Sequence, residues 1–256
     1  MLFHTLGNPS NPTILFFHAM GVTGESSIPV ARHLSNVFYC IMPTSTVYCP
    51  TQKYLSKLDE LHQIQSFLDK KRIQEIKLIV ASSLGADLAL TFLTTSKIPV
   101  KYVFFDGGQF AQIKKSTRNC MVPFLYLAIK SLYWSKGKTL KQIMWCDDNT
   151  IKPYFIEAGK NLTYKNLKTQ LKDSLENKPF PKLSKEMQKR IFFEFGNQED
   201  HFKYRENVIK SYPFANYPIF DGFNHMQYQI QDPKGFAKML KYIIEFNQLP
   251  KLPFVL

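Results

Sequence analysis

A pair of serines stands in the segment KLIVASSLGADLAL, residues 77–90, where it could supply a nucleophilic hydroxyl. The apolar, β-branched run before the pair predicts a strand and the residues after it predict a helix, so the chain must turn sharply at the serines. The residues two places on either side of Ser83 are small, as a tight strand-to-helix turn requires, whereas Val and Leu flank Ser82 at the same distance. We therefore predict that Ser83 presents its hydroxyl at the top of the turn. The alternative is that Ser82 or Ser83 only caps the helix.

The elements that would position this turn alternate along the chain. Short, continuously apolar strands separated by helices are typical of an α/β fold with a mostly parallel sheet that helices cover on both faces. The predicted strands are residues 12–19, 38–43, 75–82, 100–106, 190–195 and 216–222. The predicted helices are residues 24–37, 55–71, 84–95, 199–212 and 233–246. Because ligands bind at the carboxyl ends of such strands, functional side chains are expected directly after a strand.

A long segment interrupts this alternation between the fourth and fifth predicted strands. At about 80 residues it is too long for a structureless loop in a compact domain. We therefore divide the chain into a core of residues 1–107 and 190–256 and a helical insertion of residues 108–189. The insertion opens with the apolar stretch MVPFLYLAIKSLYW, residues 121–134, and leaves and re-enters the core at strand ends. This favours a cap that shapes the pocket, and a packing appendage is the alternative.

The net charge of +13 raises the question of an anionic partner. The excess is local, because residues 111–190 hold 17 Lys and Arg against 6 Asp and Glu, a net of +11. These residues are mostly scattered lysines, which predicts a solvated face. The alternative is a surface that attracts an anionic substrate or makes a weak contact with an anionic membrane surface. No nucleic-acid-binding motif accompanies the charge, so we predict no nucleic-acid partner.

The remaining composition argues against several other classes of protein. Four cysteines stand at wide spacings without a CxxC motif, at Cys40, Cys49, Cys120 and Cys146. Such thiols are expected to be reduced packing groups of a cytoplasmic protein. The first residues lack the features of a secretory signal, and no apolar run reaches about 18 residues, so no membrane-spanning helix is expected. No HExxH, GxxxxGK[ST] or GxGxxG motif occurs, and we predict neither a bound metal nor another cofactor.

In these features the chain resembles the α/β-hydrolase superfamily. The family places its nucleophile in a GxSxG elbow, with an Ala-first variant in some of its lipases, and residues 81–85 read ASSLG. The order of strands and helices, the long insertion after the strand that follows the elbow, and the late histidine also match. The resemblance covers nearly the whole chain, and it implies a hydrolase with Ser83 as nucleophile.

The resemblance also implies an oxyanion hole that is built from two backbone N–H groups. One belongs to Leu84, directly after the nucleophile, where the start of a helix favours negative charge. The other lies in a loop after the first core strand, FFHAMGVTG, in which Met20 takes the donor position. Ala19 replaces the usual Gly of this loop, and His18 is expected to hold the loop in place.

Serine needs a base to accept its proton, and the base needs an acid to orient it. Only His225 lies between the last predicted strand and the last helix, where the family places its catalytic histidine. Asp200 and Glu199 compete for the acid, and we favour Asp200 because Asp is the commoner acid type. Asp106, at the end of the fourth strand, is a third candidate. His201 is expected to be exposed and without a role.

These residues predict hydrolysis of a small-molecule carboxylic ester or thioester through an acyl-enzyme intermediate. Residues 121–134 would line an acyl pocket, and lysines around it would favour an anionic or lipid substrate. A second hypothesis is a catalytically silent α/β-hydrolase-fold protein that binds a small ligand or a partner, which Ala19 and the undecided acid support. A third is a membrane-surface or nucleic-acid binder that uses the Lys-rich insertion.

Overall fold

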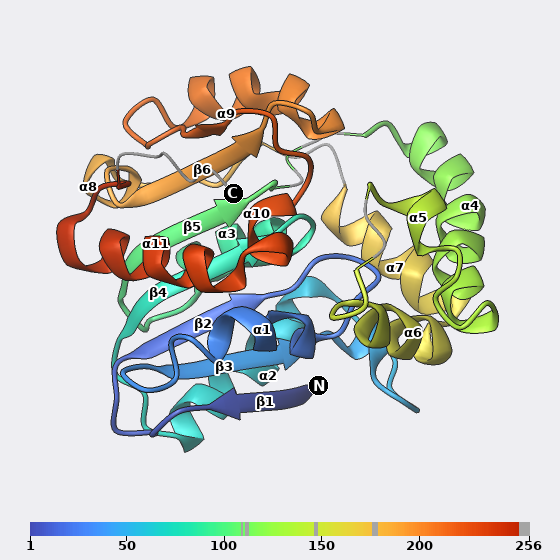
Figure 1. Ribbon diagram of the computed structural model, residues 1–256, viewed down its shortest axis with the longest axis horizontal. Helices are drawn as coiled ribbons and strands as arrows, with labels where there is room; N and C mark the ends of the chain where they lie inside the picture. The colour runs from blue at the N-terminus through green and yellow to red at the C-terminus, as the bar shows by residue number, and fades with distance from the viewer. Residues whose placement is uncertain (109, 111–112, 146–147, 176–178, 251–256) are drawn as a thin grey trace.

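The computed structural model describes residues 1–108, 110, 113–145, 148–175 and 179–250 (Figure 1). Within them, the strands form a seven-stranded sheet in the order β1-β3-β2-β4-β5-β6-β7. The strands are β1 (Leu2–Leu6), β2 (Thr13–Phe17), β3 (Tyr39–Thr44), β4 (Ile76–Ser82), β5 (Val100–Asp106), β6 (Ile191–Gly196) and β7 (Ile219–Phe220). β1 pairs antiparallel with β3, and the other neighbouring pairs are parallel. The predicted α/β fold with a mostly parallel sheet is therefore confirmed.

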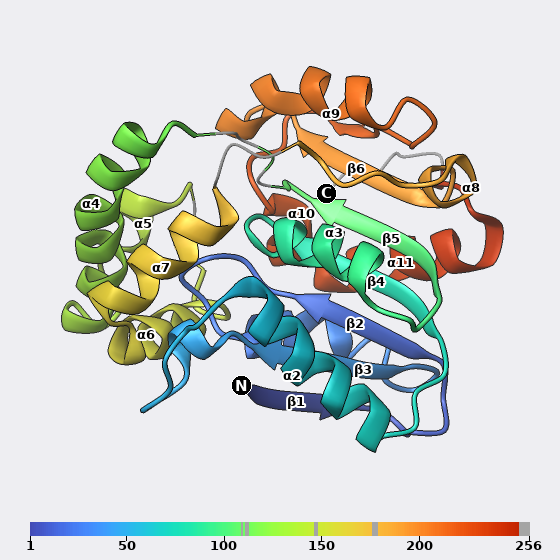
Figure 2. The same cartoon turned by 180° about the vertical axis from the view of Figure 1, so that it is seen from behind.

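Helices cover both faces of this sheet (Figures 1 and 2). One face carries α2 (Lys57–Lys70), α3 (Gly85–Thr95) and α9 (Arg205–Ser211), and the other carries α1 (Ile28–Ala31) and α11 (Pro233–Phe246). Successive side chains of a strand point to opposite faces, so a strand covered on both sides must be apolar throughout. In β5, for example, Phe105 packs into the core on one face and Phe104 into the core on the other.

The predicted helix over residues 24–37 is wrong. Only a short 3-10 turn, η1 (Gly24–Ser27), and one turn of α-helix, α1, form there. The segment lies so close to the end of β3 that a Cβ on Gly24 would come within 2.6 Å of the Pro43 carbonyl oxygen. This contact ties the start of the segment to the sheet.

The edges of the sheet also differ from the prediction. β1 is missing from the predicted strands, because LFHTL mixes polar with apolar residues and is only partly buried at the edge. At the other edge, the predicted strand over residues 216–222 shortens to the two residues of β7. The predicted helix over residues 199–212 divides into a 3-10 turn, η3 (Asp200–Tyr204), and α9.

Between β5 and β6, the described residues of the predicted insertion form five helices. They are α4 (Lys115–Trp134), α5 (Leu140–Ile143), α6 (Lys152–Asn161), α7 (Tyr164–Ser174) and α8 (Lys185–Gln188). Helices α4 to α7 pack together beside the carboxyl ends of the strands, whereas α8 lies at the start of β6 (Figures 1 and 2). Val122 and Ile129 of α4 share an apolar core with Tyr48, which lies in a loop after β3. In the part of the chain that the structure describes, no helix combines the length and the hydropathy needed to cross a bilayer.

Candidate active site

The turn after β4 holds Ser83 in an uncommon backbone conformation. Its φ of +51° lies in the left-handed region that non-glycine residues rarely adopt. The Ser83 N–H donates a 3.0 Å hydrogen bond to the Asp106 carbonyl at the end of β5, and α3 begins two residues later at Gly85. A Cβ on Gly85 would lie 2.5 Å from the Phe17 carbonyl oxygen, which explains why the position two residues after the serine must be small. The turn thus places the Ser83 side chain at the carboxyl edge of the sheet.

The two serines differ in what surrounds them. Ser82 is buried, and its Oγ accepts a 2.9 Å hydrogen bond from the Gln229 side-chain amide. Ser83 is half-buried, and both serines line a pocket together with His225. Among the described residues, no side chain caps the N-terminus of α3, so neither serine serves as the helix cap that was the alternative prediction.

The histidine that shares this pocket with Ser83 is paired with a buried carboxylate. The His225 Nδ1 lies 2.5 Å from the Glu199 Oε2, and the Glu199 side chain is 1% exposed. A proton on Nδ1 that is donated to Glu199 leaves the lone pair of Nε2 free to accept the proton of a nucleophile. An imidazole held in this way can act as a general base.

The sequence favoured Asp200 as the acid that contacts His225, and the structure differs from this prediction. Glu199 makes this contact, and Asp200 is the first residue of η3. The reason lies in the turn before them, where Glu199 N–H donates to the Gly196 carbonyl and closes a tight turn at the end of β6. That turn points residue 199 inward to His225.

Two glycines allow the close approach around His225. Gly107 has a φ of +57°, and a Cβ there would lie 2.5 Å from His225 Nδ1 and 2.8 Å from Glu199 Oε2. Gly196 packs against the backbone carbonyl of Phe223, two residues before the histidine. Any larger residue at either place would push the histidine and the carboxylate apart.

His201 is not the exposed, uninvolved residue that the sequence suggested. Its side chain lines the same pocket, and its ring centroid lies 4.9 Å from that of His225 in an edge-to-face arrangement. Burial lowers the pKa of His201 to about 4, so this imidazole is neutral near pH 7. The sequence predicted an ordinary helix here. The structure instead has the 3-10 turn η3, and His201 within it lies at the pocket.

The loop after β2 is held by His18 and Tyr48. The backbone N–H of Ser45 donates to His18 Nε2 over 3.0 Å, so the proton of the neutral ring is on Nδ1 and is donated to the Ala19 carbonyl over 2.7 Å. Burial lowers the pKa of His18 to about 4, which keeps the ring neutral. The Tyr48 hydroxyl accepts a 2.8 Å hydrogen bond from the Gly21 N–H. These bonds fix the backbone on both sides of Met20.

Both backbone N–H groups proposed for an oxyanion hole are unengaged. Within the described residues, neither Met20 N–H nor Leu84 N–H donates a hydrogen bond to a protein acceptor. Met20 lines the pocket beside Ser83, and Leu84 is the N-cap residue of α3. Such free donors beside a nucleophile can bind the negative charge that develops on a carbonyl oxygen.

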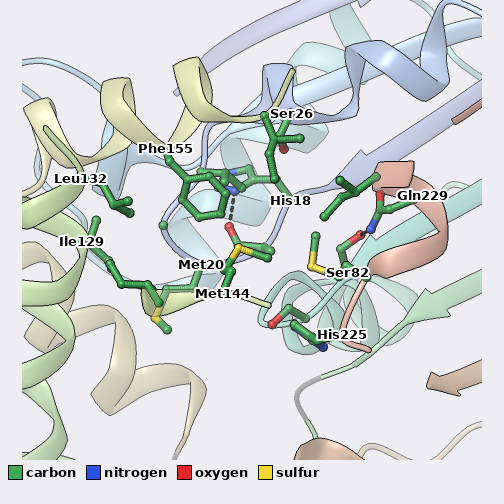
Figure 3. A pocket seen from close by; sticks show the side chains of 18 of the residues that line it. His18, Met20, Ser26, Ser82, Ile129, Leu132, Met144, Phe155, His225 and Gln229 are labelled. Carbon is green, nitrogen blue, oxygen red and sulfur yellow. Dashed lines mark hydrogen bonds between the residues drawn. The ribbon is translucent and has the colours of Figure 1, made fainter. Parts of the chain in front are cut away.

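The pocket is a cavity of about 240 Å³ with mostly apolar walls (Figure 3). The core contributes Ser83, His225 and the loop around Met20, and the helices of the insertion form the facing wall. This wall includes Leu125, Ala128, Ile129, Leu132, Met144 and Phe155. No Asp, Glu, Lys or Arg is among the described residues that line the cavity. The lysines of the insertion, which the sequence suggested for binding an anionic substrate, thus lie outside it.

Several residues of the site escaped the sequence prediction. Gln229 bonds to Ser82, and the Trp145 indole N–H donates a 2.7 Å hydrogen bond to the His225 carbonyl, which links the insertion to the histidine loop. No local pattern marks either residue. Glu194, which lies beside Asp106 in the sheet, also escaped the prediction. It could have been noticed from the sequence, because a single acid in the apolar run IFFEFG is unusual for a buried strand.

One group of side chains has the residue types of a metal site. Glu199, His201 and His225 each offer one ligand atom, and these atoms lie within 4.8 Å of one another among the described residues. Glu199 and His225 already hydrogen-bond each other, so a cation would have to displace the proton between them. The absence of a cofactor stays a prediction.

Comparisons with known proteins agree on the fold. No protein-family profile and no curated protein sequence matches this chain. A protein from Desulfitobacterium hafniense assigned to the α/β-hydrolase family superposes with a TM-score of 0.74 at 16% identity, over 95% of this chain and 100% of that chain. A carboxylesterase structure from Nitrososphaera gargenis gives 0.69 at 12% identity, over 96% of each chain. Carboxylesterase CesB from Bacillus subtilis gives 0.67 at 15% identity, over 96% and 88%.

Proposed function

We propose that this chain, which has the α/β-hydrolase fold, is a serine hydrolase that cleaves a carboxylic ester or thioester. The observation that carries the proposal is the meeting, at one pocket, of a serine on a left-handed turn and a histidine that is paired with a buried carboxylate. The esterases among the structural neighbours agree with it. The contact between Glu199 and His225 also favours a catalytic protein over a silent ligand-binding one, because a serine hydrolase needs an acid that orients its histidine.

The proposed reaction has two halves. Ser83 Oγ attacks the carbonyl carbon while its proton passes to His225 Nε2, and the N–H groups of Met20 and Leu84 hold the oxyanion. The intermediate collapses, the bond to the alcohol or thiol breaks, and the leaving group takes the proton from His225. Water then attacks the acyl-enzyme with His225 as base, which releases the carboxylic acid and restores Ser83. Glu199 orients the imidazole and stabilises its charged form in both halves.

The pocket supports a neutral, small acyl group as substrate. Its lining contains no carboxylate or ammonium group to pair with a charge, and burying an unpaired charge is costly. Its volume of about 240 Å³ is below the roughly 300–1,000 Å³ of sites for drug-sized ligands. These features suit an ester and a thioester equally.

A fluorophosphonate probe tests the proposed nucleophile directly. Such a probe reacts with a serine that a neighbouring base activates, so we expect one adduct per chain, located by peptide mass spectrometry at Ser83. Heat-unfolded protein is the control and should carry no adduct. An adduct at Ser82, or a folded protein that stays unlabelled after long exposure, would contradict the proposal.

The insertion wall predicts selectivity for the acyl chain. Ile129 and Leu127 lie on the same helix, but Ile129 is 5% exposed at the pocket whereas Leu127 is 53% exposed on the outside. Ile129→Trp should fill part of the cavity and lower the ratio of kcat/KM for hexanoate over acetate esters about tenfold, since a few methylene groups change binding by this order. Leu127→Trp should leave the ratio unchanged.

The ratio is measured on a series of p-nitrophenyl esters. It does not depend on how much of each variant is folded, so a loss of stability cannot imitate the result. Equal ratios in wild type, Ile129→Trp and Leu127→Trp would show that this cavity does not hold the acyl group.

A further inference from the structure

Two more buried carboxyl groups lie next to Glu199 and His225. Asp106 ends β5, Glu194 is the fourth residue of β6, and the two are direct neighbours in the register of the parallel strands. Each is 3% exposed. The proposed reaction does not use either of them, although burying an ionisable group costs stability unless other groups compensate for the lost contact with water.

The two carboxyl groups are placed to share one proton. The strand register sets the two buried side chains next to each other on the same face of the sheet, and a hydrogen bond between them requires that one is protonated, since a carboxylate is an acceptor only. Burial raises the pKa of Asp106 to about 6; Glu194, His225 and Gln229 oppose this rise, whereas the charge of Glu199 adds to it. For Glu194, burial and then the charge of Asp106 raise the pKa well above its ordinary value. Their mutual hydrogen bond lowers the pKa of Asp106 and raises that of Glu194, which favours Glu194 as the donor and Asp106 as the acceptor.

The carboxyl pair is continuous with the catalytic groups. Gly107 follows Asp106, donates a 3.3 Å backbone hydrogen bond to the Glu194 carbonyl, and forms the surface against which the His225 ring lies. On the other side of Asp106, the strand register places Ser82 beside it, and Gln229 joins Ser82 from above. One oxygen of Asp106, Oδ2, has no hydrogen-bond partner among the described residues. Hydrogen bonds would therefore stabilise the charge of an ionised Asp106 only in part.

The ionisable groups that face His225 come from three elements. Glu199 precedes η3 and hydrogen-bonds Nδ1, and His201 of η3 packs edge-to-face on the ring. Asp106 of β5 acts on His225 through its charge, and Glu194 of β6 stands behind Asp106. Near pH 7, His201 is neutral and adds no charge beside this imidazole, so the acids that can act on it electrostatically are Glu199 and Asp106.

We propose that Asp106 and Glu194 form a one-proton pair in which neutral Glu194 keeps Asp106 anionic, and that Asp106 is a positioning residue for His225. The second part rests on the proposed hydrolase function. When His225 takes the proton of Ser83 it becomes positive, and a preorganised anion in a buried site stabilises that charge more than the same anion would in water. Glu194 acts through Asp106, because its hydrogen bond favours the ionised form of that side chain.

Infrared spectroscopy tests the pair without any need for turnover. At pH 8 the difference spectrum between wild type and Glu194→Gln should show the loss of one carbonyl band of a buried carboxylic acid. In Asp106→Asn the band should persist at a shifted frequency, because Glu194 still carries its proton. A band that survives Glu194→Gln and disappears in Asp106→Asn would overturn the assignment of the proton.

Kinetics tests the positioning role. Asp106→Asn should lower kcat about tenfold with KM little changed, as expected when a group that orients or stabilises the base is altered. Glu194→Gln should retain kcat within about twofold, since an amide donates a hydrogen bond as the neutral acid does. A wild-type kcat in Asp106→Asn, or an equal loss in both variants, would overturn the proposal. If wild type itself lacks activity, the hydrolase function fails, while the infrared result still decides the pair.

Stability provides the control for folding. A carboxyl group with a raised folded pKa contributes stability at low pH and loses it as the pH rises from the ordinary value toward the raised one. The Tm of wild type should therefore fall relative to that of Glu194→Gln as the pH rises from 4 to 8. A Tm difference between wild type and Glu194→Gln that stays constant from pH 4 to pH 8 would mean that the pKa of Glu194 is not raised in the folded protein, which contradicts the proposal.

Discussion

Replacing Ser83 by alanine is expected to lower kcat for ester hydrolysis by roughly 10⁵- to 10⁶-fold, the loss seen when the nucleophile of a serine hydrolase is removed. The alanine keeps the pocket and the oxyanion donors, so KM should change little. The change is measured by steady-state kinetics on a p-nitrophenyl ester, with enzyme prepared free of contaminating esterases.

Ser82→Ala is the matched control for this experiment. It removes a hydroxyl from the neighbouring residue and breaks the hydrogen bond from Gln229, but leaves the Ser83 hydroxyl in place. We expect kcat within about tenfold of wild type, because a lost hydrogen bond of this kind costs about 1 kcal/mol. Activity that survives Ser83→Ala but not Ser82→Ala would reverse the assignment of the nucleophile.

Glu199→Gln should have the next largest effect, a decrease in kcat of about 10⁴-fold. A glutamine in this place can donate a hydrogen bond to His225 Nδ1, which moves the ring proton to Nε2. Nε2, which takes the serine proton in the proposed reaction, would then already hold a proton and could not accept another. The loss should appear in kcat, and the fold should remain intact by near-ultraviolet circular dichroism.

The neighbouring acid gives a control of the same chemistry. Asp200→Asn changes one carboxylate to an amide at the first residue of η3, away from the His225 hydrogen bond. We expect activity within a few-fold of wild type, as for a change near the end of a short helix. A loss in Asp200→Asn as large as that in Glu199→Gln would show that the acid moves between the two positions during the reaction.

The sheet could be predicted because its central strands carry a clear pattern. β4, β5 and β6 are short, mainly apolar runs rich in β-branched and aromatic residues, and this composition and length favour a buried strand over a helix. β1 escaped detection because an edge strand is half-exposed and its residues are mixed. The segment over residues 24–37 misled the prediction because its apolar spacing suits a helix, whereas only its residues 28–31 form one.

The turn that carries Ser83 could be predicted for a related reason. A serine on a tight strand-to-helix turn needs small residues at fixed spacings, so the requirement is local and visible around Ser83. The choice between Glu199 and Asp200 is not local, because it depends on which of two adjacent side chains the turn at Gly196 directs toward a residue far along the chain. The same limit explains His201, whose position follows from the 3-10 geometry of η3.

The pocket is built from two separate parts of the chain. The proposed reacting groups stand on loops at the edge of the sheet, whereas Ile129, Phe155 and their neighbours belong to helices that leave the sheet after β5 and return at β6. Mutations in these helices can therefore broaden or narrow the range of substrates of the proposed hydrolase without altering its proposed reacting groups. Among the described residues of the insertion, Trp145 has a different position, because its bond to the His225 carbonyl connects the insertion directly to the loop that holds this histidine.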